Sequence, residues 1–268
     1  MSRALAVLTA AGSGTRLGAR GPKALVELGG VPLLVHAARG LAEAGVAGIV
    51  ITAPRDHLGA FASSFPGGRL SLEGPRAGDG AVEVPIEVVE GSPASRQASV
   101  ARGLAALPAL GDRCGLALEE RSVVLVHDAA RCLTPPAAIA RVIDAVAAGH
   151  EAVIPAIAVT DTLKRVGERV DEGVRPVVAT PDRSTLVSVQ TPQGFAWGAL
   201  RRAHESAAAR ADSESTAATD DAGLVEAAGG RVVVVEGDPL ALKVTTPVDL
   251  ALAELLLSEK ARLNNFIR

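Results

Sequence analysis

A glycine-rich turn with two cations close behind it is the part of the sequence best suited to chemistry. Residues 10–18 read AAGSGTRLG, and Lys23 follows after a short gap. Glycines at such a turn let backbone N–H groups approach anionic oxygens closely, while Arg16 and Lys23 add positive charge. The turn therefore predicts an anion site, although a plain strand-to-helix turn explains the glycines equally well. Its spacing matches neither the Walker A motif nor the dinucleotide fingerprint, for which Gly18 comes one residue late.

The turn follows one of seven short apolar runs that predict β-strands. Between most of these runs lie segments in which apolar residues recur at helical spacing. Strands that alternate with helices indicate an α/β fold with a Rossmann-like, mostly parallel sheet and helices on both faces. In such a sheet ligands bind at the carboxyl ends of the strands, where the glycine turn stands. The predicted strands are residues 5–9, 48–52, 86–89, 123–126, 152–155, 186–189 and 231–235, and the helical segments are 33–41, 100–107, 139–146 and 248–256.

Two stretches interrupt this alternation. Residues 66–81 are rich in Gly and Pro and predict a surface loop, whereas residues 156–185 contain short Val-rich pieces and predict an extended hairpin that projects from the domain. Such an arm is hard to stabilise alone and suits pairing with a second subunit. A helix end followed by a loop is expected over 205–218. Residues 1–268 are thus expected to form a single domain with a β-arm at about 156–185.

The composition limits the classes of partner. The chain of 268 residues is 48% hydrophobic but only 2% aromatic, it lacks Tyr, and its net charge is -3. It therefore has neither the basic field nor the aromatic platforms typical of nucleic-acid binding. Its apolar runs are too short for a signal peptide or a membrane span, so we expect a cytoplasmic protein without a membrane partner. Cys114 and Cys132 are expected to be buried free thiols, because one pair makes neither a disulfide framework nor a four-ligand zinc site.

Six further motifs, taken in order along the chain, resemble one enzyme family. With the glycine turn they follow the order of the 2-C-methyl-D-erythritol 4-phosphate cytidylyltransferase family of the non-mevalonate isoprenoid pathway, and the resemblance covers about residues 5–257. One such motif would be weak, whereas seven in order are highly specific. The six motifs are SRQASV (95–100), VHDAAR (126–131), DTLKR (161–165), QTPQGF (190–195), TDD (219–221) and LKVTTPVDL (242–250).

The resemblance implies an enzyme that joins CTP to methylerythritol phosphate and releases pyrophosphate, with Mg²⁺ on the CTP phosphates. Transfer at phosphorus depends on positioning and on cations, which agrees with the charged turn. The phosphate monoester of the acceptor is already largely dianionic at pH 7, so no general base is required and His127 is expected to be structural. The implied catalytic residues are Arg16, Lys23, Arg183 and Lys243.

The resemblance also implies which residues bind each substrate. Thr162 and Arg183 lie on the predicted arm, which in the family crosses to the neighbouring subunit, so a homodimer is implied. The implied nucleotide-binding residues are Ala10, Ala11, Gly12, Gly14, Arg16, Lys23, Arg96, Ser99 and Asp128. The implied acceptor-binding residues are Asp128, Arg131, Thr162, Arg183, Thr191 and Lys243, and Asp128 is also the implied metal ligand.

Some of these residues also have plain structural interpretations. Ser99 could cap the helix that follows it, and Arg183 could be a turn residue. Asp220 and Asp221 are explained by helix capping at least as well as by catalysis, so we do not count them in the site. The chain departs from the family pattern at two places: Cys132 replaces a usual Pro, and segment 91–96 is one residue longer than the usual cytosine loop.

Two other functions are alternatives on the sequence alone. A ribitol-5-phosphate cytidylyltransferase, or another sugar-phosphate cytidylyltransferase, shares the nucleotide loops. The HDAAR run at 127–131 and Lys164-Arg165 after DTL favour methylerythritol phosphate over ribitol phosphate. A non-catalytic nucleotide-binding regulator that keeps the fold is the remote alternative, and the intact charged residues of the motifs argue against it.

Overall fold

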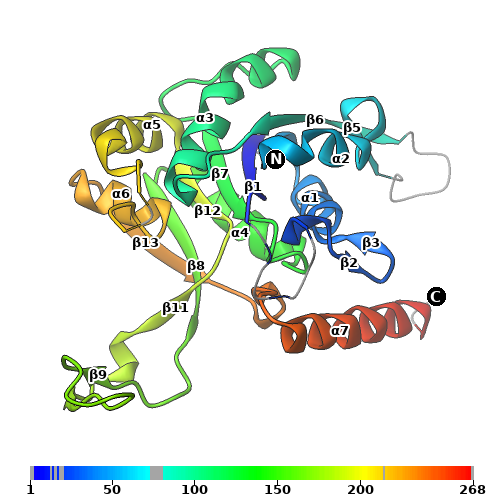
Figure 1. The fold of residues 1–268 in the computed structure, drawn as a ribbon. Coiled ribbons are helices and arrows are strands. Elements are labelled where there is room, and N and C mark those ends of the chain that lie inside the picture. Colours follow the sequence, from blue (N-terminus) through cyan, green and yellow to red (C-terminus); the bar gives the residue numbers. More distant parts are fainter. Residues whose placement is uncertain are drawn as a thin grey trace.

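The computed structural model describes residues 3–12, 14, 17, 21–72, 81–213 and 215–266, with side chains as far as Glu259 in the last helix. Within these residues a central sheet has helices on both faces, and a thin arm projects beyond them (Figure 1). This architecture confirms the predicted α/β class.

Nine strands form the central sheet in the part of the chain that the structure describes. They are β1 (Ala4–Thr9), β4 (Val46–Ala53), β5 (Arg69–Leu72), β6 (Val82–Glu90), β7 (Val123–Asp128), β8 (Ala152–Ala158), β11 (Val187–Val189), β12 (Gln193–Ala196) and β13 (Val232–Glu236). Their order is β11-β8-β12-β7-β1-β4-β6-β5, with β13 beside β8. Neighbours are parallel along β6-β4-β1-β7 and in the β8-β13 pair, whereas β5, β11 and β12 run antiparallel to their neighbours. The sheet is therefore mostly parallel, as predicted.

The path of the chain across the sheet reverses at β1. From β1 the chain passes outward to β4 and β6, and it then returns to β7 on the opposite side of β1. Thr9, Asp128 and Thr52 are Cα partners across this region, so the carboxyl ends of the three central strands lie level. Ligands of open parallel sheets bind at such a switch point.

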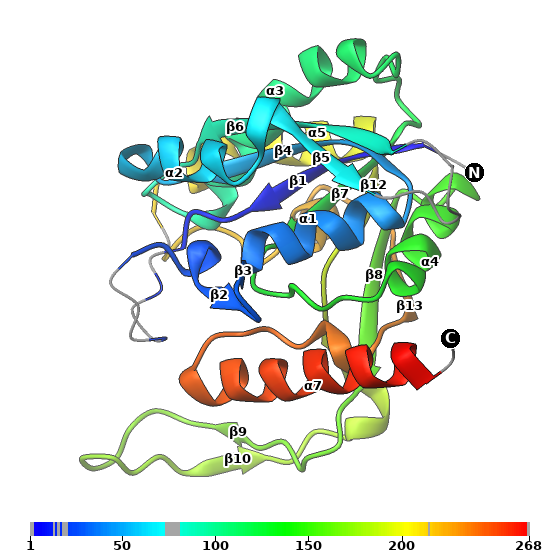
Figure 2. The same cartoon turned by 90° about the vertical axis from the view of Figure 1, so that its right-hand side faces the viewer.

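Alternate residues of the strands face opposite helical layers. The helices are α1 (Leu33–Glu43), α2 (Leu58–Ser63), α3 (Arg96–Arg113), α4 (Pro136–Ala147), α5 (Trp197–Ser206), α6 (Asp221–Ala227) and α7 (Pro247–Phe266). From β1, Ala6 and Leu8 join a buried cluster with side chains of α1, α2 and α4, whereas Leu5 and Val7 join one with α3, α5 and α6. Figure 2 shows α1 and α4 across one face of the sheet. This alternation is what a sheet buried on both faces requires.

The projecting arm is a narrow hairpin between β8 and β11. Its strands are β9 (Arg165–Val166) and β10 (Val177–Ala179), which pair antiparallel. Beyond the paired residues, Gly167 N–H donates to Pro176 O over 2.9 Å. Both views show the arm extending away from the sheet (Figures 1 and 2). The structure thus has the hairpin that the sequence predicts at this position. A second small hairpin, β2 (Glu27–Leu28) and β3 (Val31–Pro32), precedes α1.

Two short strands of the central sheet are missed by the sequence pattern. The prediction of a surface loop over 66–81 is wrong for β5, an edge strand that pairs with β6 and buries Leu70. Residues 73–80 of that stretch lie outside the described residues. Its four residues alternate, but the Gly and Pro around them dominate the composition. The pattern also misses β12, because the segment is short and contains Gly194. That glycine permits a close approach of α4, since a Cβ there would lie 2.5 Å from Val142 Cγ1.

The described residues bear on two compositional expectations. No helix among them has both the length and the apolar character needed to cross a bilayer. Cys114 and Cys132 are free thiols. Cys132 is buried as expected, and burial raises its pKa to about 12. The expectation of burial is wrong for Cys114, which follows the last residue of α3 and is only half-buried.

Candidate active site

A carboxylate stands at the switch point of the sheet. Asp128 is the last residue of β7, and the hydroxyl of Thr9, the last residue of β1, donates to Asp128 Oδ1 over 3.0 Å. The strands stay aligned beyond their ends, because Ala129 N–H donates to Thr9 O over 3.0 Å. The fold therefore holds the Asp128 side chain at the switch point, where open parallel sheets bind their ligands.

Two cations flank the Asp128 carboxylate. Lys243 Nζ lies 2.8 Å from Oδ2, and Arg96 Nε donates to Oδ1 over 3.2 Å. Burial by itself would raise the pKa of Asp128, but the charges of Arg96 and Lys243 outweigh it and hold that pKa well below its usual range. The structure thus brings together three predicted site residues, from β7, α3 and the segment before α7.

The segment that carries Lys243 is fastened to the turn after β7. Val244 N–H donates over 2.8 Å to a carbonyl of that turn. Arg131, in the same turn, donates from one terminal nitrogen to Ala241 O over 2.6 Å and from the other to Val189 O over 3.1 Å. Its Nε is buried and has no hydrogen-bond partner among the described residues. Arg131 therefore ties together three segments at the predicted acceptor side, while one of its donors stays unused.

Thr191 supports Asp128 from inside the protein. Its hydroxyl accepts a hydrogen bond from Asp128 N–H over 3.1 Å and lies 2.8 Å from His127 Nδ1. His127 is fully buried, and burial lowers its pKa to about 4, so the imidazole is neutral at pH 7. These contacts agree with the structural role expected for His127. They give Thr191 a supporting role, and its contact with an acceptor stays a prediction.

The glycine turn folds back toward the turn after β7. Gly14 has φ +74°, and a Cβ there would lie 3.0 Å from Lys23 N, so the close approach requires glycine. Lys23 N–H donates to Gly12 O over 3.2 Å. Burial raises the pKa of the Cys132 thiol, and the nearby positive charge of Lys23 opposes this rise. The side chain of Lys23 therefore lies near Cys132. Arg16 lies outside the described residues, and its role stays a prediction.

Ser99 fastens the unusually long segment 91–96. Its hydroxyl donates to Ser92 O and accepts from Ser92 N–H, each over 2.9 Å. The capping interpretation of Ser99 is wrong, because α3 is capped by Ser95, whose Oγ accepts from Ala98 N–H over 3.0 Å. The helix begins four residues earlier than the apolar spacing predicts, and Ser99 therefore lies inside its first turn.

Three of the predicted nucleotide-binding residues, Ala10, Ala11 and Ser99, lie close together near the ends of β1 and β4. Ala10 N–H continues the sheet by donating to Thr52 O over 3.1 Å, which leaves its carbonyl as the group it could offer to a ligand. A Cβ on Gly91 would lie 3.0 Å from Ala11 Cβ and 3.2 Å from Ser99 Oγ. These small residues line one narrow place beside the start of α3.

The arm residues stand apart from this group. Thr162 is exposed, and Arg183 begins a short 3-10 helix, Arg183–Thr185, in which its terminal nitrogen donates to Thr160 O over 2.5 Å. Figure 1 shows the arm extending away from the end of the sheet. Among the described residues neither side chain has a contact with Asp128. The turn interpretation of Arg183 is correct for its backbone, and its contact with a substrate stays a prediction.

The TDD motif places its two aspartates in different roles. Asp220 Oδ1 accepts from Gly223 N–H over 3.0 Å and caps α6, as the capping interpretation predicts. Asp221 is almost fully buried. Its Oδ2 accepts from Arg96 over 2.7 Å, and its Oδ1 lies 2.9 Å from His204 Nε2. The sequence does not predict that Asp221 contacts Arg96 and His204, because no spacing of residues connects α6 with α3 and α5.

Asp128 suits Mg²⁺ as a single oxygen ligand. Its Oδ1 accepts from Thr9 and Arg96, whereas Oδ2 pairs with Lys243, so a carboxylate with about four lone-pair positions keeps one for a cation. Within the described part of the chain, no three His, Cys, Asp or Glu side chains gather as a metal site. The residues present therefore fit a metal that takes most of its ligands from substrate phosphates and water.

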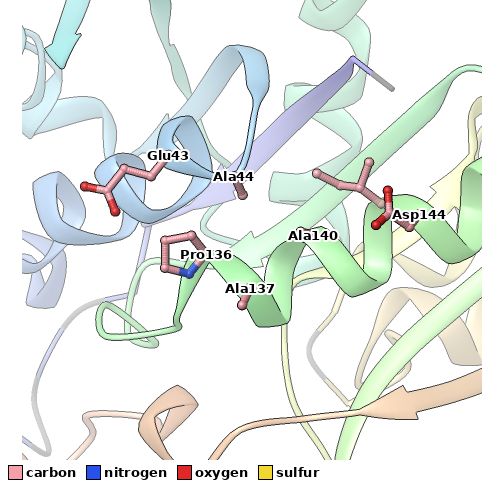
Figure 3. A pocket seen from close by; sticks show the side chains of 7 residues that line it. Glu43, Ala44, Pro136, Ala137, Ala140 and Asp144 are labelled. Atoms are coloured by element: carbon pink, nitrogen blue, oxygen red, sulfur yellow. The ribbon is translucent and has the colours of Figure 1, made fainter. Parts of the chain in front are cut away.

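A shallow hollow of about 280 Å³ lies elsewhere, between the end of α1 and one side of α4. Figure 3 shows Glu43, Ala44, Pro136 and Asp144 around it. None of its lining residues is a predicted site residue. The carboxyl edge of the sheet, with its fixed charges, is the better candidate for chemistry.

Comparisons with known proteins identify the family. A family model described as "IspD: 2-C-methyl-D-erythritol 4-phosphate cytidylyltransferase" matches residues 4–259. The chain belongs to this family. Relatives of that name from Nocardia farcinica and Streptomyces coelicolor are 42% and 44% identical, over 97% and 98% of this chain and 96% and 88% of their own lengths.

A solved structure of the family has the same fold. The cytidylyltransferase from Thermus thermophilus superposes with a TM-score of 0.65 and 34% identity, covering 96% of this chain and 98% of that one. Membership confirms the family and the enzyme class that the ordered motifs predict. These relatives carry the methylerythritol phosphate name, so the comparisons do not favour the ribitol-5-phosphate alternative.

Proposed function

We propose that the protein transfers the cytidylyl group of CTP to the phosphate of 2-C-methyl-D-erythritol 4-phosphate and releases pyrophosphate. The observation that carries this proposal is the fixed charge group at the switch point, where Asp128 stands between Arg96 and Lys243. Family membership supplies the two substrates, and the geometry supplies a place where a triphosphate and a second phosphate could meet.

The reaction needs no general base. One phosphate oxygen of the acceptor attacks the α-phosphorus, and a new P–O bond forms as the bond to the bridging oxygen of the β-phosphate breaks. The acceptor phosphate is largely dianionic at pH 7, so no proton has to be removed. His127, close to the reacting groups, is neutral and buried, so it does not titrate near neutral pH. The protein therefore acts by position and charge.

Cations neutralise the charge that builds up on the α-phosphate. We assign this role to Lys23 and Arg16 on the glycine turn, and to Lys243 on the acceptor side. The N–H groups around Gly12 and Gly14 would hold the β- and γ-phosphates. When Mg²⁺ is bound, Asp128 would supply one of its oxygen ligands, and the ion would neutralise charge on the phosphates of CTP.

The nucleotide and the acceptor would approach from two sides of Asp128. Ala10, Ala11 and Ser99 lie together at the ends of β1 and β4 and would hold the cytosine edge, with Arg96 beside them. Arg131 and Thr191, with Lys243, lie on the acceptor side. That side is completed in the proposal by the partner subunit's Thr162 and the partner subunit's Arg183, so the active form is a homodimer joined through the arms.

The decisive experiment is a substrate matrix with the purified protein. Pyrophosphate release is measured with CTP and methylerythritol phosphate, with ribitol 5-phosphate as acceptor, and with ATP, GTP or UTP in place of CTP. The proposal predicts turnover with the first pair that exceeds the others by orders of magnitude. Equal or greater turnover with ribitol 5-phosphate would contradict the acceptor. CTP binding without turnover on any acceptor would indicate a regulator.

A further inference from the structure

A line of paired charges runs from the active-site edge back into the helical layer. Lys243 pairs with Asp128, and Asp128 pairs with Arg96. Arg96 pairs in turn with Asp221 over 2.7 Å, and the line ends at a hydrogen bond between Asp221 Oδ1 and His204 Nε2, which are 2.9 Å apart. These side chains come from five separate segments. The line therefore connects the edge of the sheet mechanically with α5 and α6.

Asp221 cannot touch a substrate itself. Its side chain is 1% exposed, against 10% for Asp128 and 22% for Arg96. Burial would raise the pKa of Asp221, but the charge of Arg96 and the hydrogen bond from His204 hold it below its usual value. Any effect of this carboxylate on the reaction must pass through Arg96.

The two aspartates divide the guanidinium of Arg96 between them. Asp221 accepts from a terminal nitrogen over 2.7 Å, whereas Asp128 accepts from Nε over the longer distance of 3.2 Å. A guanidinium can also bind one carboxylate in a bidentate way, through two parallel hydrogen bonds. Because Asp221 binds a terminal nitrogen of Arg96, it keeps the guanidinium from forming such a bidentate pair with Asp128.

Asp221 is itself held in place from two sides. His204 Nε2 lies 2.9 Å from Oδ1, and the backbone N–H of Asp221 donates to Gln193 Oε1 over 3.2 Å. His204 is buried, and its Nδ1 has no partner among the described residues. Asp221 is therefore the hydrogen-bond partner that the His204 imidazole has among the described residues.

We infer that Asp221, held by His204, is a positioning residue that sets the orientation of Arg96 and so keeps Asp128 available to the nucleotide. The inference rests on the proposed function, because it requires CTP to bind at Arg96 and Asp128. Neither Asp221 nor His204 acts on the substrate directly. Their contribution is to CTP binding, and it should be lost when Arg96 is absent.

The first test is a cycle of variants with a matched control. Asp221→Asn keeps the size of the side chain but turns a donor toward Arg96 or His204, and it should raise KM for CTP at least about tenfold, the usual scale for a hydrogen bond to a charged group. KM for the acceptor should change by less than about threefold, since the acceptor side is not touched. In an Arg96→Ala background, Asp221→Asn should add nothing further. If the double variant raised KM for CTP by the product of the two single effects, the inference would be overturned.

Asp220→Asn is the control. It removes the same charge as Asp221→Asn, but from the neighbouring residue, whose side chain caps α6 and does not contact Arg96 among the described residues. It should lower the melting temperature and leave KM for CTP unchanged. A rise in KM equal to that of Asp221→Asn would show that general damage to α6 explains both, and it would contradict the inference.

His204 provides a rescue experiment. His204→Leu removes the donor to Asp221 and should reproduce the higher KM for CTP. His204→Gln offers an amide donor in its place and should restore KM to within about threefold of the parent. Equal values for Leu and Gln variants would contradict the role of His204.

A spectroscopic measurement separates this inference from the proposed function. The Nε–H signal of Arg96, assigned by its loss in Arg96→Lys, is followed in proton–nitrogen spectra without any substrate. Asp221→Asn should shift it and speed its exchange with water, while Asp220→Asn should not. An unchanged signal in Asp221→Asn would overturn the inference. Failure of the parent to use CTP, with the signal shifted as expected, would contradict the proposed function alone.

Discussion

The carboxyl edge of the central sheet and the β-arm carry the predicted site residues under opposite conditions. At the edge, Asp128 is enclosed by Thr9, Arg96 and Lys243, and its contacts run through four segments. On the arm, the side chain of Arg183 makes one hydrogen bond within the described part of the chain, to Thr160 O. The valines of this narrow arm are largely exposed.

In the proposed homodimer, one chain alone would prepare only part of the site. The edge is preorganised, because its charges are oriented before any ligand arrives. A hairpin of two short strands is only marginally stable alone, so the arm would be stabilised by the partner subunit in the proposed dimer. We therefore expect variants at the edge to change both stability and catalysis, and variants on the arm to change acceptor binding and association.

Asp128→Ala should have the largest effect. Removing this carboxylate takes from both Lys243 and Arg96 an oppositely charged partner. We expect a loss of about 3 kcal/mol in the free energy of unfolding, the lower end for a broken buried pair because Arg96 keeps Asp221. Pyrophosphate release should fall below detection. Urea unfolding and the activity assay measure the two effects. A stable variant with normal activity would show that the edge is not preorganised through Asp128.

Lys23→Ala should reduce catalysis without damage to the fold. Loss of one group that stabilises the transition state costs roughly 2.7–4 kcal/mol, which corresponds to a fall in kcat of about two to three orders of magnitude. Circular dichroism and the melting temperature serve as controls and should match the parent protein. Unchanged turnover would count heavily against the glycine turn as the triphosphate site.

Arg183→Ala tests the arm. We expect KM for methylerythritol phosphate to rise about tenfold to a hundredfold, the scale of a hydrogen bond between charged groups, while KM for CTP stays nearly constant. Mixing this variant with Asp128→Ala should restore part of the activity, because each hybrid dimer would contain one intact site. No recovery in the mixture would contradict a site shared between subunits, and an equal rise in both KM values would remove Arg183 from the acceptor side.

His127 should make the edge sensitive to acid. Its pKa in the folded protein is about 4, below the value of 6.5 for a free imidazole, so protonation favours unfolding. This part of the stability is complete above pH 6.5 and is lost as the pH falls toward 4, by about 2 kcal/mol between pH 7 and pH 5. In His127→Asn the slope of stability against pH should be shallower over this window. Identical slopes in urea titrations would contradict the neutral, buried imidazole.

A pair of Val→Ala substitutions, one on the arm and one in the sheet, should show the smallest effect and compares the packing of the two regions directly. Val177→Ala on the arm, where the side chain is 59% exposed, should change the stability of the monomer by less than about 0.5 kcal/mol. Val126→Ala in β7, where the side chain is fully buried, should cost roughly 2 kcal/mol. Sedimentation would show whether Val177→Ala also weakens the dimer. Equal losses of stability would mean that the arm is packed within one chain.

Much of the fold could be predicted because its strands are buried on both faces. The apolar run at 5–9 locates β1 to within one residue, and the helical spacing at 33–41 locates α1. The spacing is weaker in α3, which spans Arg96–Arg113, because polar and small residues dilute the apolar positions at its start and Pro108 interrupts them near its end.

The site was less predictable than the fold. The ordered motifs indicate the residues at the edge, and Arg96, Asp128 and Lys243 do meet there. The pairing of Arg96 with Asp221 joins residues far apart in the sequence, and it depends on how α3 and α6 lie on the same face of the sheet. No local pattern encodes that arrangement, so only the structure shows it.

We expect the edge between β1 and β7 to receive the triphosphate of CTP. A crystal structure of the protein with CTP and Mg²⁺ is the decisive measurement. It should show the triphosphate between the glycine turn and Asp128, with Lys23 against its phosphates and the base beside Ser99. A nucleotide bound elsewhere, with this edge empty, would show that the edge is not the triphosphate site.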